Sequence, residues 1–287
     1  MLNALRHVWR HPLNAEAPLS GIGRFVRWQI ATRLLPGAAV AVPFTDRARL
    51  LVSHGMYGAT QNVYCGLNDF AEMSFLLHYL REDDLFLDVG ANVGAYTVLA
   101  SGAAGARSYA FEPSPAAIES LRDNVELNRI ADRVHIEPYA IGRAPGSVPI
   151  TTGGPSAMHH IGAGESTIPT EMRTIDSYRL HPAIMKIDVE GYEAEVLAGA
   201  IETASCPELV AIITENNEES RKYGDGIQSI SSFMNQHGFT AVTYDPWRRD
   251  IAAKHQRSDN TLYLRDIEKV KHRVAEAEPF HVFGRSI

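Results

Sequence analysis

The sequence predicts an α/β fold built on a mostly parallel, doubly wound sheet. From residue 70 onward, short apolar runs alternate with helix-length amphipathic segments, and connections of a few residues join them. The first run, 83–90, is apolar almost throughout its centre, as in a parallel strand that is covered on both faces. The last two strands have no helix-length segment between them, so one of them is expected to run antiparallel near the edge.

Seven strands and their helices can be placed along the chain. The strands are expected at 83–90, 107–113, 133–142, 184–191, 209–216, 240–245 and 261–266. The helices are expected at 71–80, 94–104, 115–128, 193–204, 227–238 and 266–278. The stretch 147–173 interrupts the alternation with four Gly, three Pro and a pair of histidines, and it predicts an irregular loop or β-excursion on the substrate side.

The net charge of −7 is divided unevenly along the chain. Seven Arg against two acids give the first 50 residues a charge of +5, so the remainder carries −12. We expect a basic N-terminal extension at 1–69 that packs on the core, a core domain at 70–265, and a C-terminal helix and tail at 266–287. A basic amphipathic helix at 20–35, with Ser20 as its N-cap, is expected to pack on the core domain; contact with a membrane surface or a partner is the alternative.

Composition excludes several classes of function. The negative net charge disfavours a nucleic-acid partner. Cys65 and Cys206 stand apart from any metal-binding spacing, which favours reduced thiols in a cytoplasmic protein over a disulfide framework or a zinc site. Charged residues interrupt the first segment, and the longest apolar run, 34–44, is short, so neither a secretory signal nor a membrane span is expected.

A glycine-containing turn follows the first core strand. Asp88, Gly90, Asn92 and Gly94 fall at alternate positions, and the glycines allow backbone to approach a ligand beside a helix N-terminus. A dinucleotide site would place a glycine where Asn92 stands, and the carboxylate of Asp88 would repel a pyrophosphate. That carboxylate suits a ligand with an ammonium group, such as S-adenosylmethionine, which also carries a sulfonium cation.

An acid at the end of the second strand supports a nucleoside ligand. Glu112 lies 22 positions after Gly90, and Pro113 turns the chain directly afterwards. A carboxylate at this place hydrogen-bonds the ribose hydroxyls of a bound nucleoside. The alternative is two ordinary strand–helix turns with surface acids.

Candidate catalytic acids follow the fourth and fifth strands. Asp188 and Glu190 end the run 185–191, and Glu215 ends the next strand, so all three are expected at the ligand-binding edge of the sheet. Alternatively, Lys186 and Glu190 form a salt bridge and Glu190 caps the next helix. His159 and His160 could supply a base, although paired loop histidines are more often solvated. A divalent metal on Asp188 or Glu215 could activate a hydroxyl instead, but with no settled third ligand no metal site is predicted.

Three motifs in this order resemble the FkbM family of S-adenosylmethionine-dependent methyltransferases: FLDVGANVGAYTVLAS (86–101), AFEPSP (110–115) and MKIDVEGYEAEVLAGA (185–200). LRDNVELN (121–128) and SDNTLYLR (258–265) are also similar. The resemblance implies a Rossmann-like class I core, with a seven-stranded sheet, that methylates hydroxyls of natural products, sugars or glycolipids. It implies a methionine-end site at Asp88, Gly90, Asn92, Gly94 and Glu72, ribose contact through Glu112, and an adenine site near Tyr139 and Ala140.

Two other functions are weighed against methyl transfer. A nicotinamide-dependent oxidoreductase could use a similar sheet, but the turn lacks the middle glycine and carries Asp88. A non-catalytic nucleoside-binding module could use its basic N-terminus to dock on a membrane or partner. The favoured partner is a small-molecule or glycan acceptor, with at most a peripheral membrane contact through the N-terminal segment.

Overall fold

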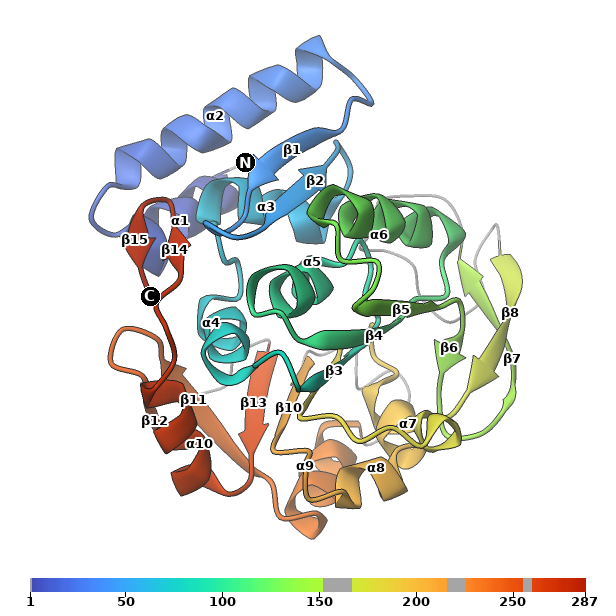
Figure 1. The fold of residues 1–287 in the computed structure, drawn as a ribbon. Helices are drawn as coiled ribbons and strands as arrows, with labels where there is room; N and C mark the ends of the chain where they lie inside the picture. Colours follow the sequence, from blue (N-terminus) through green and yellow to red (C-terminus); the bar gives the residue numbers. More distant parts are fainter. Residues whose placement is uncertain (1, 152–166, 216–225, 255–259) are drawn as a thin grey trace.

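The computed structural model describes residues 2–151, 167–215, 226–254 and 260–287. An eight-stranded sheet forms its centre (Figure 1). In spatial order its strands are β12 (Asp250–Ala253), β11 (Thr240–Asp245), β13 (Asn260–Leu264), β10 (Ala211–Glu215), β9 (Ile184–Ile187), β3 (Leu85–Val89), β4 (Arg107–Phe111) and β5 (Val134–Glu137).

The strand directions confirm the predicted α/β class. Strands β5, β4, β3, β9 and β10 are parallel, and β13 runs antiparallel between β10 and β11. The expected number of seven is wrong, because β12 adds an eighth strand antiparallel to β11. A turn without glycine joins this pair: the Asp245 carboxylate accepts from the N–H groups of Trp247 and Arg248, and Arg249 adopts a φ of 53°. Hairpin turns usually place Gly or Asn at positive φ, so the sequence carried no recognisable signal here.

Helices cover both faces of this sheet (Figure 1). Alternation along β3 sends Phe86 into the apolar cluster shared with α4 (Phe70–Tyr79), η2 (Val98–Ala103) and α10 (Ile267–Ala275). Leu87 points the other way, into the cluster shared with α7 (Glu193–Ala198) and α9 (Gly226–Gln236). The sheet is therefore buried on both sides, which explains its near-continuous apolar strands.

Three further helices complete the core. The short helix α5 (Ala95–Thr97) leads directly into η2, which is π-helical, and together they fill the predicted span 94–104. Helix α6 (Pro115–Asn128) packs Leu121 and Val125 near Ala110 of β4. The helix expected at 193–204 is broken into α7 and α8 (Ile201–Ser205). The break follows Gly199, where a Cβ would lie 2.1 Å from the carbonyl oxygen of Gly142.

The strand expected at 133–142 is also divided. Strand β5 ends at Glu137, because Pro138 has no N–H to donate to a continuing ladder. The chain then forms β6 (Ala140–Ile141) in a separate sheet with β8 (Thr167–Arg173) and β7 (Gly146–Thr151). Strands β7 and β8 pair antiparallel, as the β-excursion alternative for 147–173 predicts. His159 and His160 lie outside the described residues.

Residues 2–69 form three α-helices, one short 3₁₀ helix and a hairpin. They are α1 (Leu2–Arg10), η1 (Pro12–Asn14), α2 (Pro18–Leu34), the hairpin of β1 (Val40–Pro43) and β2 (Arg49–Val52), and α3 (Tyr57–Cys65). Helix α2 begins at Pro18 and not after Ser20, because proline suits the first helical position. Its residues Phe25 and Trp28 are buried in the same apolar cluster as Phe86 of the central sheet.

The other face of α2 is apolar and exposed. Leu19, Val26, Ile30 and Leu34 recur at helical spacing, and between 44% and 75% of each residue is exposed. No helix in the described part of the chain is both long and apolar enough to cross a membrane. The cytoplasmic location expected from the sequence stays a prediction.

The end of the chain docks on its beginning. A hairpin of β14 (His281–Val282) and β15 (Arg285–Ser286) lies beside α1 and the start of α2 (Figure 1). Arg285 donates to the carbonyl oxygen of Pro12 at 3.0 Å and to Glu16 Oε1 at 2.7 Å. The Arg24 guanidinium lies 3.7 Å from the centre of the Phe283 ring. The C-terminal hairpin therefore packs on α2 and on the segment between α1 and α2 and holds them in place.

Candidate active site

A cavity of about 580 Å³ opens at the carboxyl ends of β3, β9 and β10. Parallel strands of an α/β sheet bring their carboxyl ends to one edge, where ligands bind. Six of the candidate donor-binding and catalytic residues line this cavity, namely Glu72, Asp88, Gly90, Asn92, Asp188 and Glu215. The structure therefore gathers residues from four separate segments into one site.

The turn after β3 depends on its first glycine. Gly90 has a φ of 81°, and a Cβ there would lie 1.9 Å from the carbonyl oxygen of Asp188. The N–H groups of Gly90 and Ala91 both donate to the Phe111 carbonyl oxygen. A residue without a Cβ thus lets the turn pack against the ends of both neighbouring strands.

The last glycine of the turn, Gly94, supports the helix and lies outside the cavity lining. Its φ is 86°, and a Cβ would lie 2.3 Å from Leu121 Cδ1. A larger residue would therefore be strained at this φ and would crowd the Leu121 side chain of α6.

Glu112 is buried beneath the same turn. Its Oε2 accepts from the N–H of Asn92 at 2.8 Å, and its Oε1 accepts from the N–H of Ser114 at 2.9 Å. Burial raises the pKa of this carboxyl to about 7. Glu112 is not among the residues that line the cavity, although Asn92, which it holds, is one of them. Its two oxygens thus tie the ends of β3 and β4 together.

Asp88 carries an unsatisfied acceptor at the cavity. The residue is 1% exposed, and Thr97 Oγ1 donates to its Oδ2 at 2.7 Å. Its Oδ1 is buried without a hydrogen-bond partner among the described residues, as is Oδ1 of Asn92. Burial raises the pKa of Asp88 despite the nearby Lys186 ammonium. Buried acceptors in this state fit a ligand that brings donors or positive charge.

A buried lysine stands at the centre of the site. Lys186 is 4% exposed, and its Nζ lies 2.7 Å from Asp188 Oδ2. Burial acts to lower the pKa of Lys186, but the carboxylates of Asp188, Asp88 and Asp69 outweigh it and raise that pKa. Lys186 therefore stays charged and keeps Asp188 oriented. Because its ammonium occupies one oxygen of Asp188, it competes with a divalent metal for that carboxylate.

Further acids come from the start of α4. Asp69 Oδ2 accepts from the hydroxyl of Tyr96 at 2.9 Å, and burial raises the pKa of Asp69. Burial and the neighbouring Asp69 raise the pKa of Glu72 to about 7. Together with Asp88, Asp188 and Glu215, these residues surround the cavity with five carboxyl groups.

Sequence reasoning missed Asp69, Tyr96, His7, Gln61 and Asn260, which also line the cavity. Asp69 stands directly before a helix, where an acid usually indicates an N-cap. In the structure its side chain makes no capping hydrogen bond to α4. A buried pair with Tyr96 depends on the docking of two helices, and local sequence carries no signal for it.

Three other candidates lie apart from the cavity lining. Tyr139 follows β5, and its ring lies 3.5 Å from the Arg173 guanidinium carbon. Ala140 is buried in β6. Glu190 adopts a φ of 51° in the turn after β9, where Glu193 Oε1 accepts from the N–H of Gly191 at 2.9 Å.

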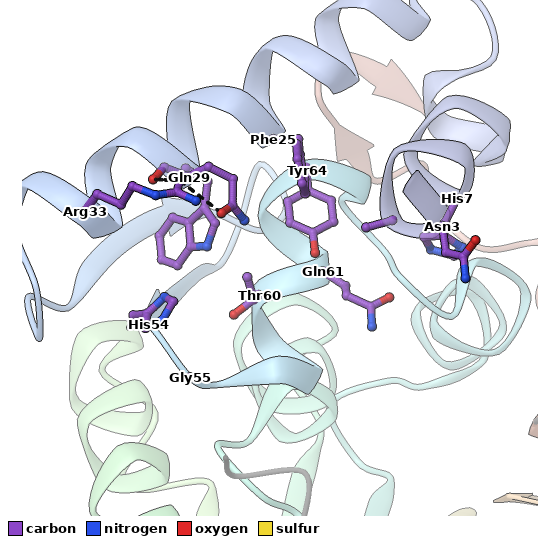
Figure 2. Close-up of a pocket in the computed structure, with 12 residues that line it drawn as sticks. Asn3, His7, Phe25, Gln29, Arg33, His54, Gly55, Thr60, Gln61 and Tyr64 are labelled. Atoms are coloured by element: carbon purple, nitrogen blue, oxygen red, sulfur yellow. Dashed lines mark hydrogen bonds between the residues drawn. The ribbon is translucent and has the colours of Figure 1, made fainter. Parts of the chain in front are cut away.

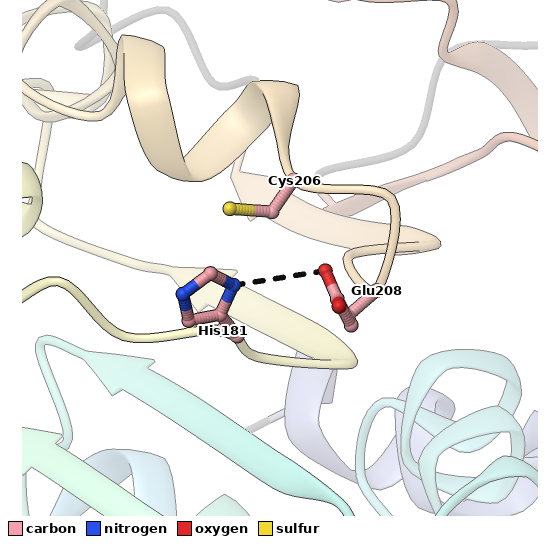
Figure 3. Close-up of side chains that lie close together, drawn as sticks. All are labelled: His181, Cys206 and Glu208. Carbon is pink, nitrogen blue, oxygen red and sulfur yellow. Dashed lines mark ion pairs between the residues drawn. The ribbon is translucent and has the colours of Figure 1, made fainter.

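A separate group of metal-ligand side chains lies near the amino ends of β9 and β10. Figure 3 shows His181, Cys206 and Glu208 facing one another, with His181 Nδ1 3.7 Å from Glu208 Oε2. Both partners of this ion pair are more than half exposed. Burial and the Glu208 carboxylate raise the pKa of the Cys206 thiol, which disfavours the thiolate that a zinc ion needs. We assign no function to this group.

Comparison with known proteins points to one family. Residues 88–241 match the family model described as the methyltransferase FkbM domain. The chain is 30% identical over 136 residues to hexuronic acid methyltransferase AglP of Haloferax volcanii, covering 43% of this chain and 53% of that protein. It therefore spans about half the length of this relative.

The chain is also similar to a second methyltransferase and to a solved structure. Over 230 residues the chain is 26% identical to 31-O-demethyl-FK506 methyltransferase FkbM of Streptomyces tacrolimicus, covering 67% of this chain and 86% of that protein. A solved structure, precorrin-6y C5,15-methyltransferase of Geobacter metallireducens, aligns with 68% of this chain and 86% of that chain. Its TM-score of 0.39 and identity of 12% are too low to bear on function.

The raised pKa of Glu72 predicts a pH-dependent stability. The folded protein retains a proton on Glu72 up to about pH 7, whereas the unfolded chain releases it near the ordinary value of 4.5. The free energy of unfolding should therefore fall as pH rises through this window. Relative to Glu72→Gln, we expect the melting temperature of the parent to drop by at least about 2 °C between about pH 5 and pH 8.

Differential scanning fluorimetry of the ligand-free protein measures this shift. Glu278→Gln, which replaces an exposed acid, serves as the control and should follow the parent at every pH. Parallel curves for the parent and Glu72→Gln would contradict the assigned protonation.

Proposed function

This chain belongs to the FkbM family of S-adenosylmethionine-dependent methyltransferases, and we propose that it transfers a methyl group to a hydroxyl group of a small-molecule or glycan acceptor. The observation that most directly supports this function is the acid-lined cavity at the carboxyl edge of the sheet. Beside the glycine turn, Oδ1 of Asp88 is buried there without a hydrogen-bond partner among the described residues. A cavity of this charge suits a cationic ligand.

The turn after β3, together with Glu72 and Glu112 beside it, is proposed to hold the methyl donor. Asp88, Gly90, Asn92 and Glu72 would receive the methionine end, since all four line the cavity. Glu112 would accept from the ribose hydroxyls through the lone pairs that its two backbone hydrogen bonds leave available. The roles of Gly94, Tyr139 and Ala140 rest on family resemblance and on their places beside this region.

Glu112→Ala is expected to abolish donor binding, because it removes the ribose acceptor and releases the N–H groups of Asn92 and Ser114. Isothermal titration with S-adenosylhomocysteine measures the loss, which should exceed about 100-fold in Kd. Glu119→Ala, an exposed acid of α6, should bind like the parent.

Circular dichroism establishes that the variant is folded. Unchanged affinity in a folded Glu112→Ala protein would remove Glu112 from the donor site. A parallel titration with NAD separates the oxidoreductase alternative: micromolar NAD binding without S-adenosylhomocysteine binding would overturn methyl transfer.

Asp188 is the proposed general base. S-adenosylmethionine, when bound, supplies a methyl group already activated by its sulfonium. The chain must then orient the acceptor hydroxyl, exclude water and accept the hydroxyl proton. Lys186 holds Asp188 through Oδ2, which leaves Oδ1 to receive that proton. Glu215 lines the same cavity and Glu190 follows the same strand, so both remain candidates for this role.

Asp188→Asn is expected to lower kcat by about 10²- to 10⁴-fold and to change the Kd of S-adenosylhomocysteine by less than about threefold. Radiolabelled methyl transfer and titration measure the two quantities. Glu215→Gln and Glu190→Gln should lose less activity, and Glu208→Gln, at the opposite edge, should lose none. A larger loss in Glu215→Gln than in Asp188→Asn would transfer the role to Glu215.

Hydroxyl acceptors are favoured by the relatives. One is named for a hexuronic acid and the other for 31-O-demethyl-FK506. Tritiated methyl transfer into candidate hydroxylated acceptors, followed by mass spectrometry of the product, tests this class directly. A nucleic-acid acceptor is not proposed, because the net charge is −7.

We further propose that α2 contacts an anionic membrane surface. Its exposed residues Leu19, Val26, Ile30 and Leu34 form an apolar face. Arg27 and Arg33 are exposed on the same helix, and 17–45 contains no acid. Apolar area combined with basic residues favours binding to anionic lipids.

The double variant Val26→Ser/Ile30→Ser is expected to reduce vesicle binding by at least about fivefold without changing the melting temperature, since both side chains are exposed. Sedimentation with phosphatidylglycerol-containing vesicles measures binding, and pure phosphatidylcholine vesicles should bind less. Ile201→Ser replaces an equally exposed residue of α8 and serves as the control. Equal sedimentation of all three proteins would contradict the contact.

A further inference from the structure

A second cavity adjoins the acid-lined cavity at the carboxyl ends of β3, β9 and β10, which we call the donor cavity. The second cavity has a volume of about 590 Å³, and all its lining residues fall between Asn3 and Tyr64, on α1, α2, α3 and the segment before α3 (Figure 2). His7 and Gln61 line both cavities. The two cavities therefore share a boundary at these two side chains.

One wall of the second cavity is aromatic. Phe25, Trp28 and Tyr64 are between 5% and 7% exposed, and the Phe25 and Tyr64 rings meet edge to face with centroids 5.2 Å apart. Figure 2 shows the Tyr64 hydroxyl pointing toward Gln61. Burial raises the pKa of Tyr64 to about 12, so this hydroxyl remains a hydrogen-bond donor. Aromatic faces with a few convergent polar groups are typical of small-molecule sites.

Apart from Tyr64, the ionisable side chains that line the second cavity are all basic residues. Arg33, His54 and His7 line the cavity, and no carboxylate is among its described lining residues. The Arg33 guanidinium donates through Nη1 to the Gln29 carbonyl oxygen at 2.7 Å and to Gln29 Oε1 at 3.4 Å, as Figure 2 shows. These contacts hold the guanidinium at the cavity and use only one of its three nitrogens.

The two adjoining cavities therefore differ in charge. The donor cavity carries five carboxyl groups around Lys186, whereas the second carries Arg33 and two histidines. A cationic ligand favours the first environment and an anionic ligand favours the second. Methyl transfer needs both substrates side by side, which is the arrangement that these cavities provide.

We propose that the second cavity binds the methyl acceptor, and that this acceptor carries a carboxylate or phosphate held by Arg33 beside an apolar or ring face that packs on Trp28 and Tyr64. The proposal rests on the proposed methyl transfer. The acceptor hydroxyl would pass between His7 and Gln61 toward Asp188. The anionic group is the shared chemistry, and it can come from an acidic sugar or from a phosphorylated one.

Three probes distinguish these sources: methyl glucuronide, glucose 1-phosphate and neutral methyl glucoside. Binding to the full chain saturated with S-adenosylhomocysteine is measured by saturation-transfer NMR titration. At least one anionic probe is expected to bind about 10-fold more tightly than methyl glucoside, since a hydrogen bond to a charged group is worth about that factor or more.

The matched variants are Arg33→Gln and Arg27→Gln, which remove the same charge from α2 inside and outside the cavity lining. Arg33→Gln is expected to lose about 10-fold in affinity for the anionic probe, Arg33→Lys to recover part of it, and Arg27→Gln to stay within about twofold of the parent. None of the three should change the Kd of S-adenosylhomocysteine.

The outcomes separate the two proposals. Equal binding of all three probes, binding of none of them, or equal losses in Arg33→Gln and Arg27→Gln would overturn the acceptor site while S-adenosylhomocysteine binding sustains the methyl-donor site. Absence of S-adenosylhomocysteine binding in the parent protein would instead overturn the proposed function itself.

Discussion

The buried ammonium group of Lys186 is the interaction on which the site depends. It pairs with Asp188, which follows β9, and it faces Asp88 of β3 and Asp69 at the start of α4. Without this cation, the buried carboxyl of Asp88 would lie near those of Asp69 and Asp188 with no opposite charge from Lys186, which is unfavourable. With it, the carboxyl groups still outnumber the ammonium, so the cavity retains a preference for a second positive charge. Stability and ligand preference thus come from the same cluster.

The parts of the site that the sequence could predict are those fixed by local geometry. The turn from Asp88 to Gly94 carries its own conformational signal, and Glu112 follows at the distance of one helix and one strand. Asp69 and Tyr96 could not be found in this way, because they meet only when α4 docks against α5. The same limit applies to the fold. The alternation of strands and helices could be predicted from the sequence, but β12 could not. The turn before it places Arg249 at a φ of 53°, where glycine or asparagine is usual.

The N-terminal extension has a larger part in the site than its sequence suggested. Its basic amphipathic helix was expected to pack on the core domain, with contact to a membrane surface or a partner as the alternative. The structure places two of its arginines differently. Arg33 lines a cavity that adjoins the donor site, whereas Arg27 lies outside that lining on the same helix. Most acids of the donor cavity come from the core, whereas Arg33, His7 and His54 of the second cavity come from the extension, so the uneven charge along the chain separates the two cavities. Variation in the extension could therefore change the acceptor without altering the donor site.

The docking of the C-terminal hairpin has a consequence for biosynthesis. Arg285 and Phe283 contact residues near the start of the chain, across more than 250 positions of sequence. While the ribosome is still translating the core, α1 and α2 are already outside the exit tunnel but lack the hairpin that fixes them. The segments that line the proposed acceptor cavity, all between Asn3 and Tyr64, therefore emerge first, whereas the hairpin that packs on α1 and α2 emerges last. A nascent chain would thus hold α1 and α2 without their C-terminal contacts until translation is nearly finished.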